Sequence, residues 1–128
     1  MGTRSLTFCY EEKKKEPFFC MYAQYDGYPN GIGAELAYFL NSRRLVNGIG
    51  ADEEVFNGMP CLAAQLISFF KDGAGGYYIY PAKLEQECHQ EYEYHIFTDK
   101  VKIIEKYDNK TIFEGSWSDF LIFCNRDE

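Results

Sequence analysis

Residues 24–33 read Gln24-Tyr25-Asp26-Gly27-Tyr28-Pro29-Asn30-Gly31-Ile32-Gly33, and in this stretch the chain changes from one periodicity to another. The residues before this stretch are rich in aromatic and other β-favouring side chains. After it, Leu36, Ala37 and Leu40 follow Ile32 at helical spacing. A dense run of glycine, proline, asparagine and aspartate between two such segments is typical of a turn. The sequence therefore predicts a strand, a turn and a helix that begins near Gly31–Ala34.

The segments on either side extend this pattern. Ser5–Tyr10 and Phe18–Tyr25 flank the charged run 11–17, which predicts a β-hairpin with a solvated tip. Residues 47–50 are expected to form a loop after the first helix, and Ala51–Gly58 to be irregular. A second helix should start at Pro60 and end at Asp72-Gly73. Its expected buried stripe is Leu62, Ala63, Leu66, Ile67 and Phe70.

The second half of the chain favours strands. The expected strands are Tyr77–Tyr80, Tyr92–Phe97, Val101–Tyr107 and Thr111–Glu114. Ser116–Cys124 fits either a short helix capped by Ser116 or Ser118, or another strand. Connections are short and strands follow one another, so the sequence predicts one α+β domain over residues 1–128. This domain would have an antiparallel sheet of about five to six strands with two main helices packed on it.

Composition excludes several classes of protein. The 128 residues carry a formal charge of −7, which disfavours general binding to nucleic-acid backbones. No apolar run approaches the roughly 20 residues of a membrane span, and no export signal is recognised. The five cysteines include no CxxC pair, so reduced thiols and a cytoplasmic location are expected. Aromatic residues make up 18% of the chain, which is the unusual feature of its composition.

The glycine-rich stretch has two interpretations. A strand that enters a glycine-rich turn and then a helix can present backbone N–H groups to an anion, which makes Gly31 and Gly33 candidate ligand-binding residues. The dinucleotide fingerprint needs a third glycine that is absent from this stretch. The alternative is a purely structural connection whose glycines adopt positive φ.

Asp26, Tyr28 and Arg4 are the polar candidates beside that stretch. Asp26 could cap the turn, pair with an arginine, or act as an acid or base. Arg4 could form an ion pair with Asp26 across the hairpin, or be a solvated charge at the strand edge. Tyr78, in the run Gly75–Pro81, is a candidate stacking face for a ring or a partner protein, or else a core residue with its hydroxyl at the rim. Glu85–Glu93 is an acidic stretch that could face a basic partner.

Catalysis and metal binding find little support in the sequence. Neither His89 nor His95 has a Cys or His partner at zinc spacing, so no metal site is expected. No local pattern supports a cysteine nucleophile, and no cofactor is expected. His95 alternates with Tyr94 and Ile96, which predicts a partly exposed histidine on a strand.

The opening Met1-Gly2-Thr3-Arg4, together with Tyr25-Asp26-Gly27-Tyr28-Pro29-x-Gly31-x-Gly33, resembles a family of small uncharacterised proteins. Bacteriophages, bacteria and some fungi encode its members. Phage-type members are also similar through Asn57–Ala64 and Gly75–Pro81, so the resemblance covers most of residues 1–98. It implies no particular activity, and no catalytic residue is carried over from it. By analogy of context, it implies a role in binding.

Three hypotheses about function follow. The first is a non-enzymatic, phage-type binding protein that counters host antiviral defence by sequestering a nucleotide-derived signal in the host cytoplasm. Its ligand-binding residues would be Arg4, Asp26, Tyr28, Gly31, Gly33 and Tyr78. The second is an inhibitor that binds a host defence protein through an acidic and aromatic surface. The third is a small enzyme acting on a nucleotide or modified metabolite, with Asp26 as acid or base and Arg4 as anion clamp. A homo-oligomer is compatible with each.

Overall fold

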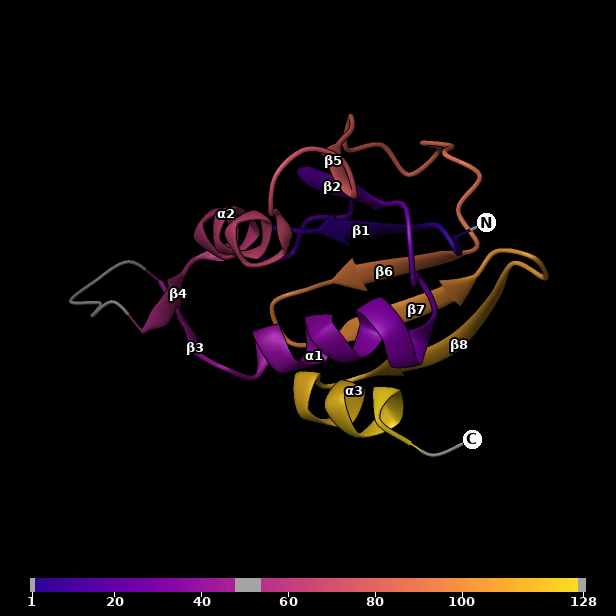
Figure 1. Ribbon diagram of the computed structural model, residues 1–128. Helices are drawn as coiled ribbons and strands as arrows, with labels where there is room; N and C mark the ends of the chain where they lie inside the picture. The colour runs from indigo at the N-terminus through magenta and orange to yellow at the C-terminus, as the bar shows by residue number, and fades with distance from the viewer. Residues whose placement is uncertain (1, 48–53, 127–128) are drawn as a thin grey trace.

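The computed structural model describes residues 2–47 and 54–126, and Figure 1 shows the path of the chain. The strands are β1 (Ser5–Cys9), β2 (Phe19–Ala23), β3 (Arg44–Val46), β4 (Val55–Asn57), β5 (Tyr77–Ile79), β6 (Tyr92–Ile96), β7 (Val101–Glu105) and β8 (Lys110–Gly115). The helical elements are the π-helical turn η1 (Pro29–Gly33), α1 (Ala34–Leu40), α2 (Met59–Phe70) and α3 (Trp117–Cys124).

Six strands form one sheet in the order β5-β2-β1-β6-β7-β8, and β3 pairs with β4 in a small second sheet. The predicted α+β class and strand number are confirmed. The large sheet was expected to be antiparallel, but it is mixed, because β1 and β6 are parallel while the other neighbouring strands are antiparallel. The parallel pair arises where the chain leaves β2, forms the helical half of the molecule and returns on the other side of β1.

The helices cover one face of the large sheet. Figure 1 shows α1 passing in front of β6 and β7, with α3 beneath it and α2 at the end of β1. Their apolar sides share one core with alternate residues of the central strands, and Leu36, Leu62 and Phe120 are fully buried in it. The strand residues of this core are Cys9, Met21, Ala23, Tyr94, Ile96, Val101 and Ile103.

The opposite face of the sheet carries a second apolar cluster. Its buried members are Leu6, Phe8, Tyr10, Cys20 and Tyr22. No helix of the described residues contributes to this cluster, but Ala82 and Cys88 pack against it. These two residues belong to residues 80–91, a segment without regular structure that we call the strap. The sheet is therefore covered on one face by helices and on the other by the strap.

Three details differ from the sequence-based expectation or decide between its alternatives. Arg44–Val46 and Val55–Asn57 are short parallel strands, although no strand was expected in either segment. Residues 116–124 adopt the helical alternative, because the Ser116 side chain accepts a hydrogen bond from the Asp119 N–H at 3.1 Å. Helix α2 ends at Phe70, before the expected stop at Asp72-Gly73, and the expected glycine loop at 48–50 lies outside the described residues.

In the part of the chain that the structure describes, every helix is too short or too polar to cross a bilayer.

Candidate functional site

The turn after β2 is held together by hydrogen bonds between its own backbone groups. Asp26 adopts a left-handed conformation with φ of 57°, a region that aspartate tolerates better than most residues. Its carbonyl accepts from the Ile32 N–H at 2.7 Å, and the Tyr28 carbonyl accepts from the N–H groups of Gly31 at 2.8 Å and Gly33 at 3.4 Å. These three amides therefore have partners inside the turn, which supports the structural interpretation of the glycine-rich stretch.

The two candidate glycines are needed because of close packing. Neither Gly31 nor Gly33 has a positive φ, so that expectation was wrong. A Cβ on Gly31 would collide with the Asp26 carbonyl and lie 2.9 Å from the Tyr28 ring. A Cβ on Gly33 would lie 3.0 Å from Cys124 Sγ and 3.3 Å from the Tyr94 hydroxyl. Small residues thus let η1 lie directly on β6 and α3.

Asp26 and Tyr28 are neighbours at the surface of this turn. The Tyr28 hydroxyl donates to Asp26 Oδ1 at 3.1 Å. This hydrogen bond, and the negative charge of Asp26, raise the pKa of Tyr28. The turn therefore presents a neutral phenol beside a carboxylate.

Arg4 lies on the strap face of the sheet, opposite the face that η1 covers. Its Nε donates to the Tyr22 hydroxyl at 3.1 Å, and the predicted ion pair with Asp26 is not formed. The Tyr22 ring lies 5.9 Å from that of Tyr78 and 5.6 Å from that of Tyr80. Arg4 and Tyr78 thus belong to one group around Tyr22, whereas Asp26, Tyr28, Gly31 and Gly33 belong to another around η1. The reason is strand alternation, which directs Arg4 to the side of Leu6 and Phe8.

A cavity of about 490 Å³ adjoins η1, and we call it the Tyr28 cavity. Its lining comes from η1, β6, β8 and the end of α3, and consists of Tyr28, Pro29, Asn30, Tyr92, Ile112, Phe123, Cys124 and Arg126. The Arg126 guanidinium carbon lies 4.1 Å from the centre of the Phe123 ring, which is cation–π geometry. The cavity thus combines aromatic rings with a cation. Of the predicted site residues, Tyr28 is the one in its lining.

The sequence analysis missed Tyr92, Phe123 and Arg126. Tyr92 is half-buried, and burial is the main cause that raises its pKa, followed by the charges of Glu105 and Glu91. No local motif marks these residues, because the sheet and α3 bring them together from distant parts of the chain.

A buried polar network lies on the strap side of the sheet. The Tyr10 hydroxyl lies 2.6 Å from His95 Nδ1, and His95 Nε2 lies 3.0 Å from Glu93 Oε1. His95 is 4% exposed, so the expectation of a partly exposed histidine was wrong. With Glu93 ionised, Nε2 donates to that carboxylate; Nδ1 accepts from Tyr10 while His95 is neutral and donates to it when His95 is protonated.

Tyr10, His95 and Glu93 form a chain along which a proton could move, but all three side chains are buried, which disfavours a role in catalysis. Tyr10 and Glu93 are each 3% exposed, so a substrate atom does not reach them in this structure. Burial also raises the pKa of Tyr10 well above its ordinary value, which disfavours a tyrosinate nucleophile. We therefore assign the network to the closure of the strap face.

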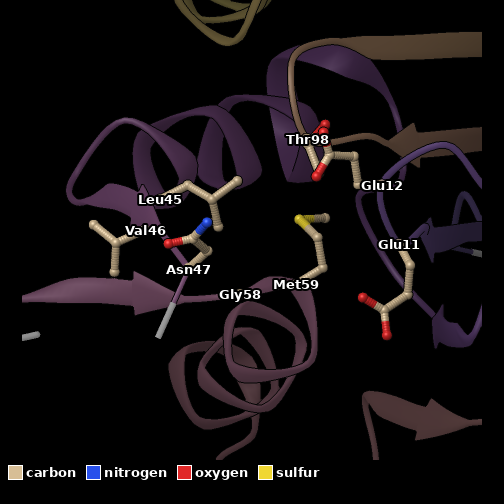
Figure 2. Close-up of a pocket in the computed structure, with 8 residues that line it drawn as sticks. All are labelled: Glu11, Glu12, Leu45, Val46, Asn47, Gly58, Met59 and Thr98. Carbon is tan, nitrogen blue, oxygen red and sulfur yellow. The ribbon is translucent and has the colours of Figure 1, made fainter. Parts of the chain in front are cut away.

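Another cavity, of about 600 Å³, lies where the first hairpin approaches the start of α2. Figure 2 shows the side chain of Met59 between Leu45 and the two glutamates, Glu11 and Glu12. The described residues of its lining include carboxylates and no cation, which is the wrong charge for a phosphate group. Across residues 2–47 and 54–126, no group of three or more His, Cys, Asp or Glu side chains is arranged to hold a metal ion.

Comparison with known proteins gives no relative from which a function could be transferred. No family model, no curated protein and no solved structure matches this chain.

Proposed function

We propose that this chain is a non-enzymatic binding protein that takes up a small nucleotide-like molecule in the Tyr28 cavity. The observation that carries the proposal is the Arg126 guanidinium over the Phe123 ring, in the wall of a cavity also lined by Tyr28 and Tyr92. Aromatic rings accept a flat base by stacking, and a guanidinium pairs with a phosphate group. The volume, about 490 Å³, lies within the range typical of small-molecule sites.

The resemblance to phage-encoded proteins supplies the context. A small binding protein made by a phage would act in the host cytoplasm, where capture of a nucleotide-derived signal would blunt an antiviral response. The proposed site differs from the one expected from sequence, because Tyr28 is joined by Tyr92, Phe123 and Arg126 instead of Arg4 and Tyr78.

Calorimetry against a panel of cyclic nucleotides and ADP-ribose derivatives tests this proposal. We expect one ligand of the panel to bind, and Tyr28→Ala and Arg126→Ala each to weaken its binding at least about tenfold, since each removes a stacking or phosphate contact. Tyr107→Ala is the matched control, because Tyr107 is 90% exposed and lies outside the cavity. Absence of binding across the panel would contradict the proposal.

A second candidate function is the direct inhibition of a host protein. It is favoured by a different observation: Tyr78 and Ile79 of β5 are 42 and 60% exposed, and Leu84 of the strap is 44% exposed. Glu85 and Glu87 follow Leu84 in the strap, so exposed apolar side chains and negative charges are neighbours in this part of the chain. Such a surface suits a partner that is basic and partly apolar.

Capture from host lysate separates the two functions. A stoichiometric partner that is retained by the wild-type chain, lost with Ile79→Ser, and released by salt would favour the second. Retention of that partner by the Ile79→Ser variant would exclude this surface.

A further inference from the structure

The strap is attached to the sheet at few points. At its ends, the Tyr80 N–H donates to the Cys20 carbonyl at 3.1 Å, and the Glu91 N–H donates to the Arg4 carbonyl at 2.8 Å. Between these ends, most residues are exposed and none belongs to a helix or strand. Ala82, Gln86 and Cys88 are partly exposed, and Gln90 is the one buried residue among them, with an exposed fraction of 6%. The closure of the strap therefore depends strongly on what holds Gln90.

Gln90 organises the strap through both ends of its side-chain amide. Its Oε1 accepts from the Cys88 N–H at 2.8 Å, and its Nε2 donates to the Gln86 carbonyl at 3.2 Å. The same Nε2 donates to Glu93 Oε2 at 2.9 Å. This last bond connects the strap to a side chain of the central strand β6.

Glu93 can accept at both oxygens only while it is ionised. Its Oε2 receives Gln90, and its Oε1 receives His95 Nε2 at 3.0 Å, so both oxygens face donors. A proton added to Oε2 would point at the Gln90 donor, and a proton added to Oε1 would require His95 Nε2 to give up its own proton and accept. Lys106 Nζ, 3.5 Å from Oε2, further favours the ionised form.

We propose that the Glu93 carboxylate is a charge-dependent latch, which closes the strap at neutral pH and releases it when its charge is removed. Release would expose Leu6, Phe8 and Cys20, each of which is fully buried beneath the strap side of the sheet. This inference does not depend on the Tyr28 cavity, which lies on the other face.

The groups around Glu93 set the direction of its pH dependence. Facing this carboxylate or its partner His95 are Lys106 after β7, Lys102 opposite His95 on β7, Tyr10 after β1, Cys20 on β2 and Cys88 on the strap. Burial by itself raises the pKa of Glu93. The hydrogen bonds from His95 and Gln90 and the charges of His95 and Lys106 outweigh it, so the net pKa is lowered below 4.5.

The sign of the effect follows from linkage. A carboxyl group whose pKa is lowered by folding stabilises the closed state above its ordinary pKa, and this contribution is lost as the pH falls through the lowered value. The strap should therefore be fully closed at neutral pH and should open in acid, below pH 4.5.

Hydrogen–deuterium exchange with peptide resolution tests the latch. At pH 7, Glu93→Gln should raise exchange of the strap amides at least about tenfold, because the neutral amide either turns its NH₂ toward Gln90 Nε2 or accepts a weaker, uncharged hydrogen bond from it. Amides of β6 and β7 serve as the internal reference and should keep their protection. Glu91→Gln is the matched control, since it makes the same change at an exposed glutamate just before β6.

The pH dependence provides a second measurement. After correction for intrinsic exchange rates, strap exchange in the wild-type chain should rise as the pH is lowered below 4.5, and in Glu93→Gln it should be high at pH 7 as well as in acid. Equal strap protection in the wild type and Glu93→Gln would overturn the proposal. So would an equal loss of protection in strap and sheet, because Glu93 would then support the whole fold and not the strap.

Discussion

At the scale of single residues, the close packing around Gly31 explains why the turn has a glycine at this position. A Cβ there would lie 2.9 Å from the Tyr28 ring and would collide with the Asp26 carbonyl, which is backbone and has little freedom to move. We expect Gly31→Ala to lower the free energy of unfolding by about 1–3 kcal/mol, as overpacked sites do. Chemical denaturation measures this difference.

Asn30→Ala is the control for this prediction, since Asn30 lies in the same turn but is exposed. It should change stability by no more than about 0.5 kcal/mol. If Gly31→Ala were as stable as the control, the motif glycine would not be required by the packing of η1, and a direct role in ligand binding would regain weight.

At the scale of elements, α3 depends on a capping residue that the sequence alone left open. The Ser116 hydroxyl accepts from the Asp119 N–H at 3.1 Å, whereas the Ser118 hydroxyl contacts that of Ser116 at 3.2 Å. We expect Ser116→Ala to cost about 0.5–2 kcal/mol of stability, the usual worth of an N-cap. Ser118→Ala, the matched control in the same turn, should cost less, and equal losses in denaturation experiments would assign no special role to Ser116.

The elements that the sequence predicts well are those with a local signal. β-favouring residues between turn signals mark β1, β2 and β7, alternation marks β6, and the apolar stripe marks α2, each within a few residues of the observed bounds. Strands β3 and β4 have three residues each and pair in parallel, so they depend on a distant partner and lack a recognisable period. The parallel pairing of β1 with β6 is likewise a consequence of the return path of the chain.

The candidate site was predictable to a smaller extent. Tyr28 could be named from its turn, but Phe123 and Arg126 reach the same cavity only because α3 folds back beside η1. His95 was misjudged for a related reason. Alternation correctly separates its face from that of Tyr94, but it does not reveal that the acidic segment 80–91 covers that face.

At the scale of the whole molecule, the outer edge of the sheet at β5 is protected. Lys71 Nζ donates to the carbonyls of Tyr77 at 2.8 Å and Gly75 at 2.9 Å, so a cation occupies acceptors at this short edge strand. A lysine placed there hinders pairing with a strand from another chain. Contacts by the exposed side chains of Tyr78 and Ile79 are therefore better supported than extension of the sheet.

The closure of both faces of the sheet can be measured through the five thiols. Cys9 and Cys124 are buried on the helix side and Cys20 on the strap side, whereas Cys61 and Cys88 are partly exposed. Burial raises the pKa of Cys20 and Cys124 to about 12, and that of Cys9 still further, so these three are neutral thiols at pH 7. Because the thiolate is the reactive form, we expect two thiols to react quickly with an aromatic disulfide reagent and three only after unfolding. Cys61→Ser should remove one fast thiol and Cys9→Ser none; a third fast thiol in the native protein would show that one face of the sheet is open.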